Sequence, residues 1–259
     1  MLAVFTDLDN CLLDHDTYEY APASEALGRL RDLGARVVCV TSKTRAEVEY
    51  WQSQIGLEHP SVVENGGAVI LESGEAVVLG RPREEIVGAL AEAAAAAGAR
   101  WRGFSMMPVE EIAARCAMPV ERAVFAAGRQ YSEPFVLETP ERGEALRAEM
   151  AARGLRLTRG GRFHHALAHE GKEAGVRWLL AREAAVSIGV GDAPNDDGFL
   201  ALVDHPIKLG ADGTGPAAWN RAVLAVLKKL SGRGLAIDGY RVTRRQTQPP
   251  GPIRSSPTF

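Results

Sequence analysis

Lysine is scarce in this sequence of 259 residues, and cysteine and aromatic residues are also few. Only five of the 30 basic residues are lysines, and the formal net charge is -3. A chain with this balance has no general positive field, so nucleic acid is not expected as a partner. A small anionic ligand would need cations placed locally, which makes any lysine near a motif informative.

The three cysteines, Cys11, Cys39 and Cys116, are too few and too widely spaced for a disulfide scaffold. They are expected as small buried side chains in a reducing compartment. No apolar run approaches the ~18 residues that a membrane span needs, and no basic region precedes Asp7 as it would in a secretory signal. The prediction is a cytoplasmic protein that does not enter a membrane, and a homodimer is left open.

Strand and helix patterns alternate along the first part of the chain. Strands are predicted at 2–5 and 36–40, and helices at 22–33 and 44–54, the second one opening on a capping box of Thr44 and Glu47. A hairpin is predicted at 68–79, through Ser73 and Gly74. Alternation resumes with helices at 172–182 and 216–230 and strands at 186–190 and 206–209. This order is typical of a doubly wound sheet.

Residues 83–167 interrupt that alternation. They contain helical patterns at 84–97 and 141–152 and strand patterns at 133–138, 155–158 and 162–168. The predicted fold is therefore α/β: a doubly wound, Rossmann-like parallel-sheet core of residues 1–82 and 168–243, with an inserted α+β cap domain of residues 83–167. Residues 244–259 contain four prolines and almost no apolar periodicity, which predicts a disordered tail.

Acids and hydroxyls follow three of the predicted core strands. Asp7 and Asp9 follow the first, Thr41 and Ser42 the second, and the loop GDAPND with Asp192 and Asp196 a later one. In an open α/β sheet, ligands bind beyond the carboxyl ends of the strands, so these groups are expected at one site. Phosphoryl transfer needs a nucleophile, a proton donor and cations against phosphate charge, and candidates for each are present.

The segments VFTDLDNCLL, VVCVTS, the isolated Lys172 and GVGDAPND resemble, in this order, the four motifs of the haloacid dehalogenase-like phosphatases. The resemblance implies that Asp7 is the nucleophile that forms an aspartyl-phosphate and that Asp9 is the general acid and base. It implies that Thr41 hydrogen-bonds the phosphoryl group and that Lys172 orients Asp7. It also implies a Mg²⁺ site, with the ligands Asp7, Asp9 (through its carbonyl), Asp192 and Asp196. An oxygen-only ligand set suits this hard ion.

Five further blocks resemble the mannosyl-3-phosphoglycerate phosphatase family: TSKTRAE, ENGGAV, GRQYSEPF, GGRFHH and GPAAWN. That substrate carries a phosphate, a carboxylate and a sugar, so arginine or lysine is expected at the anions and carboxylate or hydroxyl groups at the sugar. Alternation along the strand sends His164 and His165 to opposite faces, so at most one of them is expected to face the ligand. The predicted substrate-binding residues are Ser42, Lys43, Asn65, Gly66, Gly67, Arg129, Ser132, Glu133, Arg162 and His165.

The implied function is a magnesium-dependent phosphatase that converts mannosyl-3-phosphoglycerate, a small phosphorylated sugar, into mannosylglycerate, a compatible solute. Two alternatives remain open at this point. One is a phosphatase for another sugar phosphate, such as glucosyl-3-phosphoglycerate or sucrose phosphate. The other is a protein that binds a phosphorylated ligand without catalysis, which the presence of Asp7, Asp9, Lys172 and Asp192 disfavours.

Overall fold

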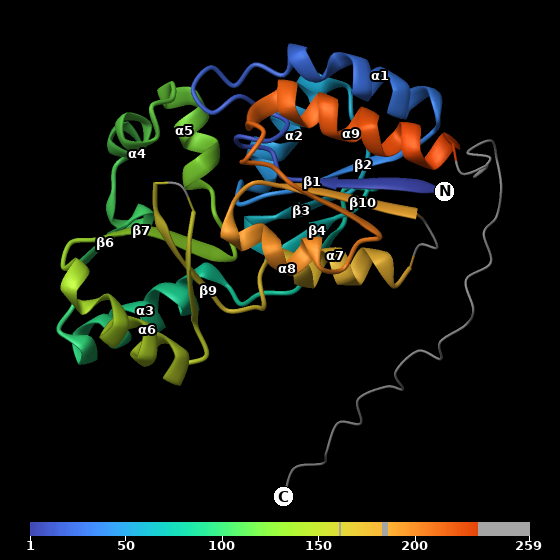
Figure 1. Cartoon of the computed structure of the whole chain (residues 1–259). Helices are drawn as coiled ribbons and strands as arrows, with labels where there is room; N and C mark the ends of the chain where they lie inside the picture. The colour runs from blue at the N-terminus through green and yellow to red at the C-terminus, as the bar shows by residue number, and fades with distance from the viewer. Residues whose placement is uncertain (161, 183–185, 233–259) are drawn as a thin grey trace, which may run out of the picture.

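Two β-sheets with helices around each make up the described part of the chain (Figure 1). The computed structural model describes residues 1–160, 162–182 and 186–232, so the predicted tail lies outside the described residues. The larger sheet has seven strands, in the spatial order β11-β10-β1-β2-β3-β4-β5. These are β1 (Leu2–Thr6), β2 (Arg36–Val40), β3 (Ser61–Val63), β4 (Ala68–Ile70), β5 (Ala76–Val78), β10 (Val186–Gly191) and β11 (His205–Lys208).

Five strands of this sheet, from β11 to β3, run parallel, and β4 and β5 are added as the antiparallel hairpin that was predicted. Successive residues of β1 pack against opposite layers, as in a parallel strand buried on both faces. Leu2 and Val4 pack with α1 (Ser24–Asp32), α2 (Arg45–Ile55) and α9 (Gly215–Gly232). Ala3 and Phe5 pack with α7 (Lys172–Leu180) and α8 (Asp197–Leu200). The predicted α/β fold class is confirmed.

Helix α2 shows how local sequence positions the site. The Thr44 hydroxyl accepts a hydrogen bond from the Glu47 amide, and the Glu47 carboxylate accepts one from the Thr44 amide, so the predicted capping box is present. Gly56 ends the helix in the left-handed conformation. This capping box fixes the start of α2 directly after the polar residues that follow β2.

The smaller sheet is antiparallel and has the order β6-β7-β9-β8. Its strands are β6 (Trp101–Gly103), β7 (Ser132–Leu137), β8 (Arg156–Arg159) and β9 (His164–Leu167). Helices α3 (Arg83–Ala97) and α6 (Gly143–Ala152) share an apolar cluster with it. We call the elements from α3 to β9 the cap and the others the core. The exact boundaries of 82/83 and 167/168 remain a prediction.

Two cap helices were not predicted, α4 (Val109–Cys116) and α5 (Val120–Ala127). They pack on each other and on Phe104 and Phe163, apart from the α3 and α6 cluster. Each has eight residues and directly follows a proline, Pro108 or Pro119, which is a helix-start signal. In Figure 1 the cap lies beyond the carboxyl ends of the core strands, with α4 and α5 at its upper end.

All three cysteines are buried and free, as expected. Across the described residues, we find no helix with both the length and the apolar character that a bilayer crossing requires.

Candidate active site

Polar residues at the carboxyl ends of three adjacent strands form the floor of the site. Asp7 follows β1, Thr41 to Lys43 follow β2, and Asp192 follows β10. Because β1 lies between β10 and β2, the three strand ends meet at one edge of the sheet. The amide of Asp7 donates to the Val190 carbonyl at 2.9 Å, which ties the first of these ends to β10.

Lys172, the first residue of α7, connects two of the acids. Its Nζ lies 3.0 Å from Asp7 Oδ2 and 2.7 Å from Asp196 Oδ1, and its side chain is 1% exposed. Burial alone would lower the pKa of the Lys172 ammonium, but Asp196 and Asp7 outweigh burial, and the pKa lies above its ordinary value. The ammonium therefore stays charged under the site.

The Asp7 carboxyl is held in an unusual state by its surroundings. Burial raises its pKa to about 7; the attraction of Lys172 opposes this shift, while Asp196 and Asp9 add to it. The Leu8 amide donates to Asp7 Oδ1 at 2.8 Å, which leaves Oδ2 toward Lys172. A further positive charge beside this carboxyl would favour its ionised, nucleophilic form.

Asp7, Cys11 and Asp192 form a group whose ligand atoms all lie within 4.8 Å of one another. Burial raises the pKa of the Cys11 thiol far above its ordinary value, and Sγ lies 3.6 Å from Asp192 Oδ1 as a donor. The thiol is therefore a protonated neighbour of the carboxylates. Asn10 Nδ2 donates to Asp192 Oδ2 at 2.7 Å and orients it. Two carboxylates without a histidine or thiolate ligand fit a hard ion such as Mg²⁺.

Asp196, predicted as a metal ligand, lies outside this group and is fully buried. Its Oδ1 accepts from Lys172, and its Oδ2 accepts from the amides of Asp192 and Ala193 at 2.9 Å each. Both oxygens are thus occupied by donors. The geometry makes Asp196 a support for Lys172 and for the Asp192 loop, which differs from the predicted direct ligation.

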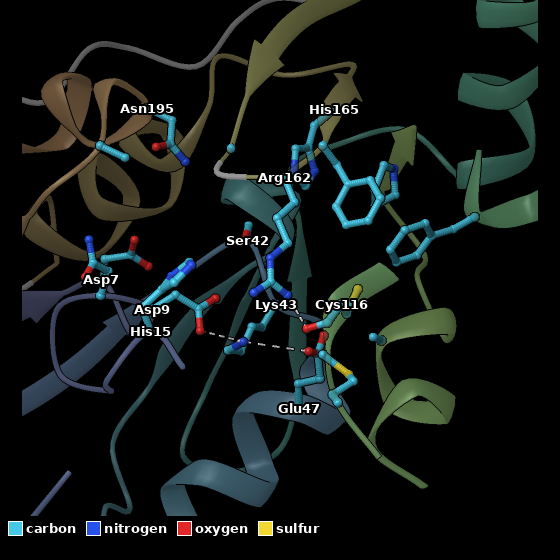
Figure 2. A pocket seen from close by; sticks show the side chains of 18 of the residues that line it. Asp7, Asp9, His15, Ser42, Lys43, Glu47, Cys116, Arg162, His165 and Asn195 are labelled. Carbon is cyan, nitrogen blue, oxygen red and sulfur yellow. Dashed lines mark hydrogen bonds and ion pairs between the residues drawn. The ribbon is translucent and has the colours of Figure 1, made fainter. Parts of the chain in front are cut away.

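Asp9 points to a second lysine. Lys43 Nζ lies 2.8 Å from Asp9 Oδ1 and 3.9 Å from Glu47 Oε1, and Lys43 is 5% exposed. Burial alone would lower the pKa of Lys43, yet the two carboxylates outweigh it and raise that pKa. Figure 2 shows these residues together in the lower part of the pocket, with Asp7 beside them.

A cavity of about 230 Å³ lies above this floor, between core and cap. The predicted residues that line it are Asp7, Asp9, Asp192, Ser42, Lys43, Arg129, Arg162 and His165. Cap residues that were not predicted also line it, among them Phe104, Cys116, Met118, Ala126 and Phe163. Phe104, Cys116, Met118 and Ala126 come from α4, α5 and their flanks, so the proline signals at 108 and 119 could have located these four. Phe163 directly precedes β9. From the core, Asn10, His15, Tyr18 and Asn195 were also missed as lining residues.

Three cap side chains bring polar groups to the cavity. Arg162 extends from the cap toward Lys43 and Cys116 (Figure 2), and its Nη1 donates to the Cys116 carbonyl. Arg129 Nη1 donates to the Ser42 carbonyl at 2.9 Å. His165 is buried, and burial, with Arg129 and Lys172, lowers its pKa to about 3, so its imidazole is neutral. His165 Nδ1 is buried and has no partner among the described residues.

The other predicted site residues do not line the cavity. Thr41 and Lys172 are buried beneath it, and Thr41 Oγ1 accepts from the Lys43 amide at 3.2 Å. Glu133 is fully buried, with Oε2 2.6 Å from Arg83 Nε and Oε1 accepting from the amide and hydroxyl of Ser105. The predicted contact of Glu133 with a sugar therefore has no support here, because cap residues occupy its carboxylate.

The turn at 65–67 and Ser132 also lie away from the cavity. Asn65 is buried and accepts through Oδ1 from Asn195 Nδ2 at 3.2 Å. Gly66 has a φ of +101°, and a Cβ there would lie 2.0 Å from the Gly171 carbonyl oxygen. A Cβ on Gly67 would lie 2.4 Å from Tyr131 Cβ. Ser132 is buried between core and cap. Gly67 and Ser132 lie at the junction of core and cap, whereas the contacts of Asn65 and Gly66 are with core residues; none of the four lines the cavity.

Comparison with known proteins yields consistent matches. Residues 4–100 match the family model of haloacid dehalogenase-like hydrolases. A glucosyl-3-phosphoglycerate/mannosyl-3-phosphoglycerate phosphatase of Persephonella marina is 30% identical over 88% of this chain and 98% of its own. An enzyme of the same name from Methanococcoides burtonii is 32% identical over 87% of this chain and 97% of its own. A phosphatase of the haloalkanoate superfamily from Bacteroides thetaiotaomicron has a similar fold, with a TM-score of 0.66 at 17% identity over 89% and 95% of the two chains.

Proposed function

The chain belongs to the haloacid dehalogenase-like hydrolases, and we propose that it is a magnesium-dependent phosphatase of mannosyl-3-phosphoglycerate. The products are mannosylglycerate and phosphate. The observation that carries the proposal is the pairing of Asp7 with Lys172 at the foot of a cavity whose opposite wall holds Arg129 and Arg162. The names of the two relatives add glucosyl-3-phosphoglycerate as a second substrate.

The reaction begins at Asp7. Its ionised carboxylate attacks the phosphorus, the bond from phosphorus to the glycerate oxygen breaks, and an aspartyl-phosphate forms. Asp9 takes up a proton before the first step and gives it to the departing alkoxide; it then takes a proton from the water that attacks the phosphorus and regenerates Asp7. Lys172 offsets charge on the phosphoryl group, and the Thr41 hydroxyl donates to one of its oxygens.

Asp7 and Asp192, with the Asp9 carbonyl, are the residues that would hold Mg²⁺. When bound, this ion supplies positive charge against the phosphoryl oxygens. The raised pKa of Asp7 supports a cation at this place, because burial leaves the carboxyl short of compensating charge. Lys43 shares the floor and keeps Asp9 within reach of the leaving oxygen through their 2.8 Å contact.

The cap wall supports recognition of the glycerate and sugar groups. The guanidinium of Arg162, and that of Arg129, can form charge-assisted hydrogen bonds to the glycerate carboxylate. The neutral His165 offers Nδ1 to a sugar hydroxyl. Phe104 and Phe163 give this wall apolar surface against which a sugar ring can pack.

The decisive experiment compares phosphate release from four esters: mannosyl- and glucosyl-3-phosphoglycerate, sucrose phosphate and a hexose phosphate without carboxylate. We expect kcat/KM to be roughly ten- to a hundredfold higher for the carboxylated esters, which is the effect of one charged hydrogen bond. The double variant Arg129→Ala with Arg162→Ala should remove most of this preference, each single variant should remove part of it, and hydrolysis of the hexose phosphate should change little. Equal rates for all four esters in the wild type would disprove the proposed substrate.

The Asp7→Asn variant is the control for mechanism. It should keep the fold and lose turnover of every ester by roughly a thousandfold or more, because the amide cannot attack the phosphorus. Binding of the carboxylated ester without turnover in the wild type would favour a non-catalytic ligand-binding protein.

A further inference from the structure

Glu64 is a buried acid in the core that none of the proposed chemistry uses. It directly follows β3 and is 2% exposed. Both Glu64 and the next residue, Asn65, have a positive φ, +48° and +58°. Left-handed backbone at a residue other than glycine is unfavourable and persists only where the surroundings determine it. The chain therefore holds the Glu64 side chain in one direction at some cost.

That direction is toward the cap. Glu64 Oε1 accepts from the Gln130 amide at 2.8 Å, and Oε2 accepts from the Tyr131 amide at 3.0 Å and the Ser132 hydroxyl at 2.7 Å. One core carboxylate thus binds three consecutive residues, the first residue of β7 and the two before it. The close approach of Gly67 to Tyr131 leaves no room for a side chain between the two segments.

Arg129 directly precedes these three residues and is linked to them. Its Nη1 donates to Ser132 Oγ at 3.1 Å and to the Ser42 carbonyl at 2.9 Å. The Ser132 hydroxyl accepts from Arg129 while it donates to Glu64. A continuous chain of hydrogen bonds therefore runs from Glu64 through Ser132 to a guanidinium that lines the cavity.

Arg129 still has an unused donor. Its Nε is buried and has no partner among the described residues. Its Cζ also lies 5.7 Å from the centre of the Phe104 ring, so the guanidinium is held at one edge by the core and rests against the cap. A side chain fixed before the ligand arrives loses less conformational freedom on binding.

We propose that Glu64 and Ser132 are positioning residues that hold Arg129 ready for the carboxylate of the substrate. This inference rests on the proposed function and extends it. Neither residue touches the substrate. Each sets the affinity for the leaving group through the orientation of Arg129, while the transfer of phosphate to Asp7 proceeds as before.

The test uses Glu64→Gln and Ser132→Ala in the full chain. Each should raise KM for mannosyl-3-phosphoglycerate about tenfold with kcat changed less than about twofold, because one charge-assisted contact is misaligned in bound substrate and transition state alike. With p-nitrophenyl phosphate, which has no carboxylate, both parameters should stay within about twofold. Asp204→Asn is the control: Asp204, an exposed acid of the core, accepts from the amide and hydroxyl of Ser187.

A double-mutant cycle with Arg129→Ala separates positioning from general damage. In the Arg129→Ala background, Glu64→Gln and Ser132→Ala should have no further effect on KM, because the group that they position is gone. Additive effects, or equal losses with both substrates, would overturn the proposal. Ser132→Ala removes only one hydroxyl, so the cycle is informative even where Glu64→Gln does not fold.

Hydrogen exchange tests the contact between Glu64 and the cap in the absence of substrate. The amides of Gln130 and Tyr131 should lose protection about tenfold or more in Glu64→Gln and keep it in Asp204→Asn. Unchanged protection would overturn the positioning role whatever the substrate is. If protection falls but the wild type does not prefer the carboxylated ester, the proposed function fails, and the cycle is run with the ester that the wild type hydrolyses best. Additive effects there would overturn the positioning role too.

Discussion

The Lys172 ammonium lies 2.7 Å from Asp196 Oδ1, and neither side chain reaches solvent. A buried ion pair loses far more when one partner is removed than when both are replaced, because the remaining charge is left without compensation. Lys172 also approaches Asp7 at 3.0 Å, so we expect the same ammonium to serve both the stability of the core and the proposed chemistry.

We predict that Lys172→Met lowers the free energy of unfolding by about 3 to 5 kcal/mol and abolishes turnover. The double variant Lys172→Met with Asp196→Asn should regain part of the stability and none of the activity. Urea denaturation measures the stability of each variant, and phosphate release measures its activity. Arg45→Met is the control, because Arg45 pairs with Glu49 at 2.6 Å and both side chains are about half exposed. Its free energy of unfolding should fall by about 0.5 kcal/mol or less. Losses of similar size in Lys172→Met and Arg45→Met would contradict the prediction.

For the metal site, we predict that Asp192→Asn raises the dissociation constant for Mg²⁺ about tenfold or more, because one of two carboxylate ligands becomes neutral. The increase in Tm that Mg²⁺ produces measures this binding by mass action. Cys11→Ala should change the dissociation constant less than about threefold, since the thiol is protonated and is not a ligand. An unchanged Mg²⁺ titration in Asp192→Asn would rule out the assigned site.

The turn between β3 and β4 is predicted to tolerate no side chain at residue 66. In Gly66→Ala, the new Cβ would lie 2.0 Å from the Gly171 carbonyl oxygen, at a φ of +101°. The free energy of unfolding should therefore fall by about 2 kcal/mol or more. Gly88→Ala is the matched control, because Gly88 is an exposed residue inside α3 with no atom within 4 Å of the new Cβ. That change should stabilise the protein by about 0.5 to 1 kcal/mol. Thermal unfolding of both variants checks the pair.

Acid is predicted to destabilise the fold through buried histidine. Burial, with a contribution from Arg156, lowers the pKa of His169 to about 4 from an ordinary value of 6.5. The unfolded chain therefore takes up a proton as the pH falls from 6.5 to 4, while the folded protein does not. Stability that is fully present above pH 6.5 is lost over this window at up to about 1.4 kcal/mol per pH unit.

His169→Gln should reduce that loss by about 1 to 2 kcal/mol between pH 7 and pH 4.5. The measurement is the free energy of unfolding in urea at both pH values, and the difference between them cancels any packing effect of the substitution. A pH dependence equal to that of the wild type would show that another group accounts for the acid loss.

The core was predictable because its signals are local. Strand β2 begins and ends at the predicted residues, and the capping box of Thr44 and Glu47 is present. The floor follows from topology alone: residues after adjacent parallel strands meet at one edge, which brought Asp7, Lys43 and Asp192 together. No knowledge of side-chain packing was needed for that step.

The cap was harder to predict for a physical reason. Polar residues of an inserted segment can face a ligand or another part of the protein, and the sequence pattern is the same in both cases. Glu133 and Ser132 were both expected at the sugar. In the structure, Glu133 binds Arg83 and Ser105, and Ser132 binds Glu64. Helices α4 and α5 have eight residues each, shorter than the window of about 11 to 18 residues over which helical periodicity is assessed.

The two walls of the cavity come from separate stretches of the chain, one from the strand ends of the core and one from α4, α5 and β9. Substrate choice and bond breaking can therefore diverge independently in evolution. Under the proposed function, substitutions on the cap wall would exchange one leaving group for another while the phosphate end of each new substrate meets the same acids and lysines. A family built in this way gains new substrates without rebuilding its catalyst.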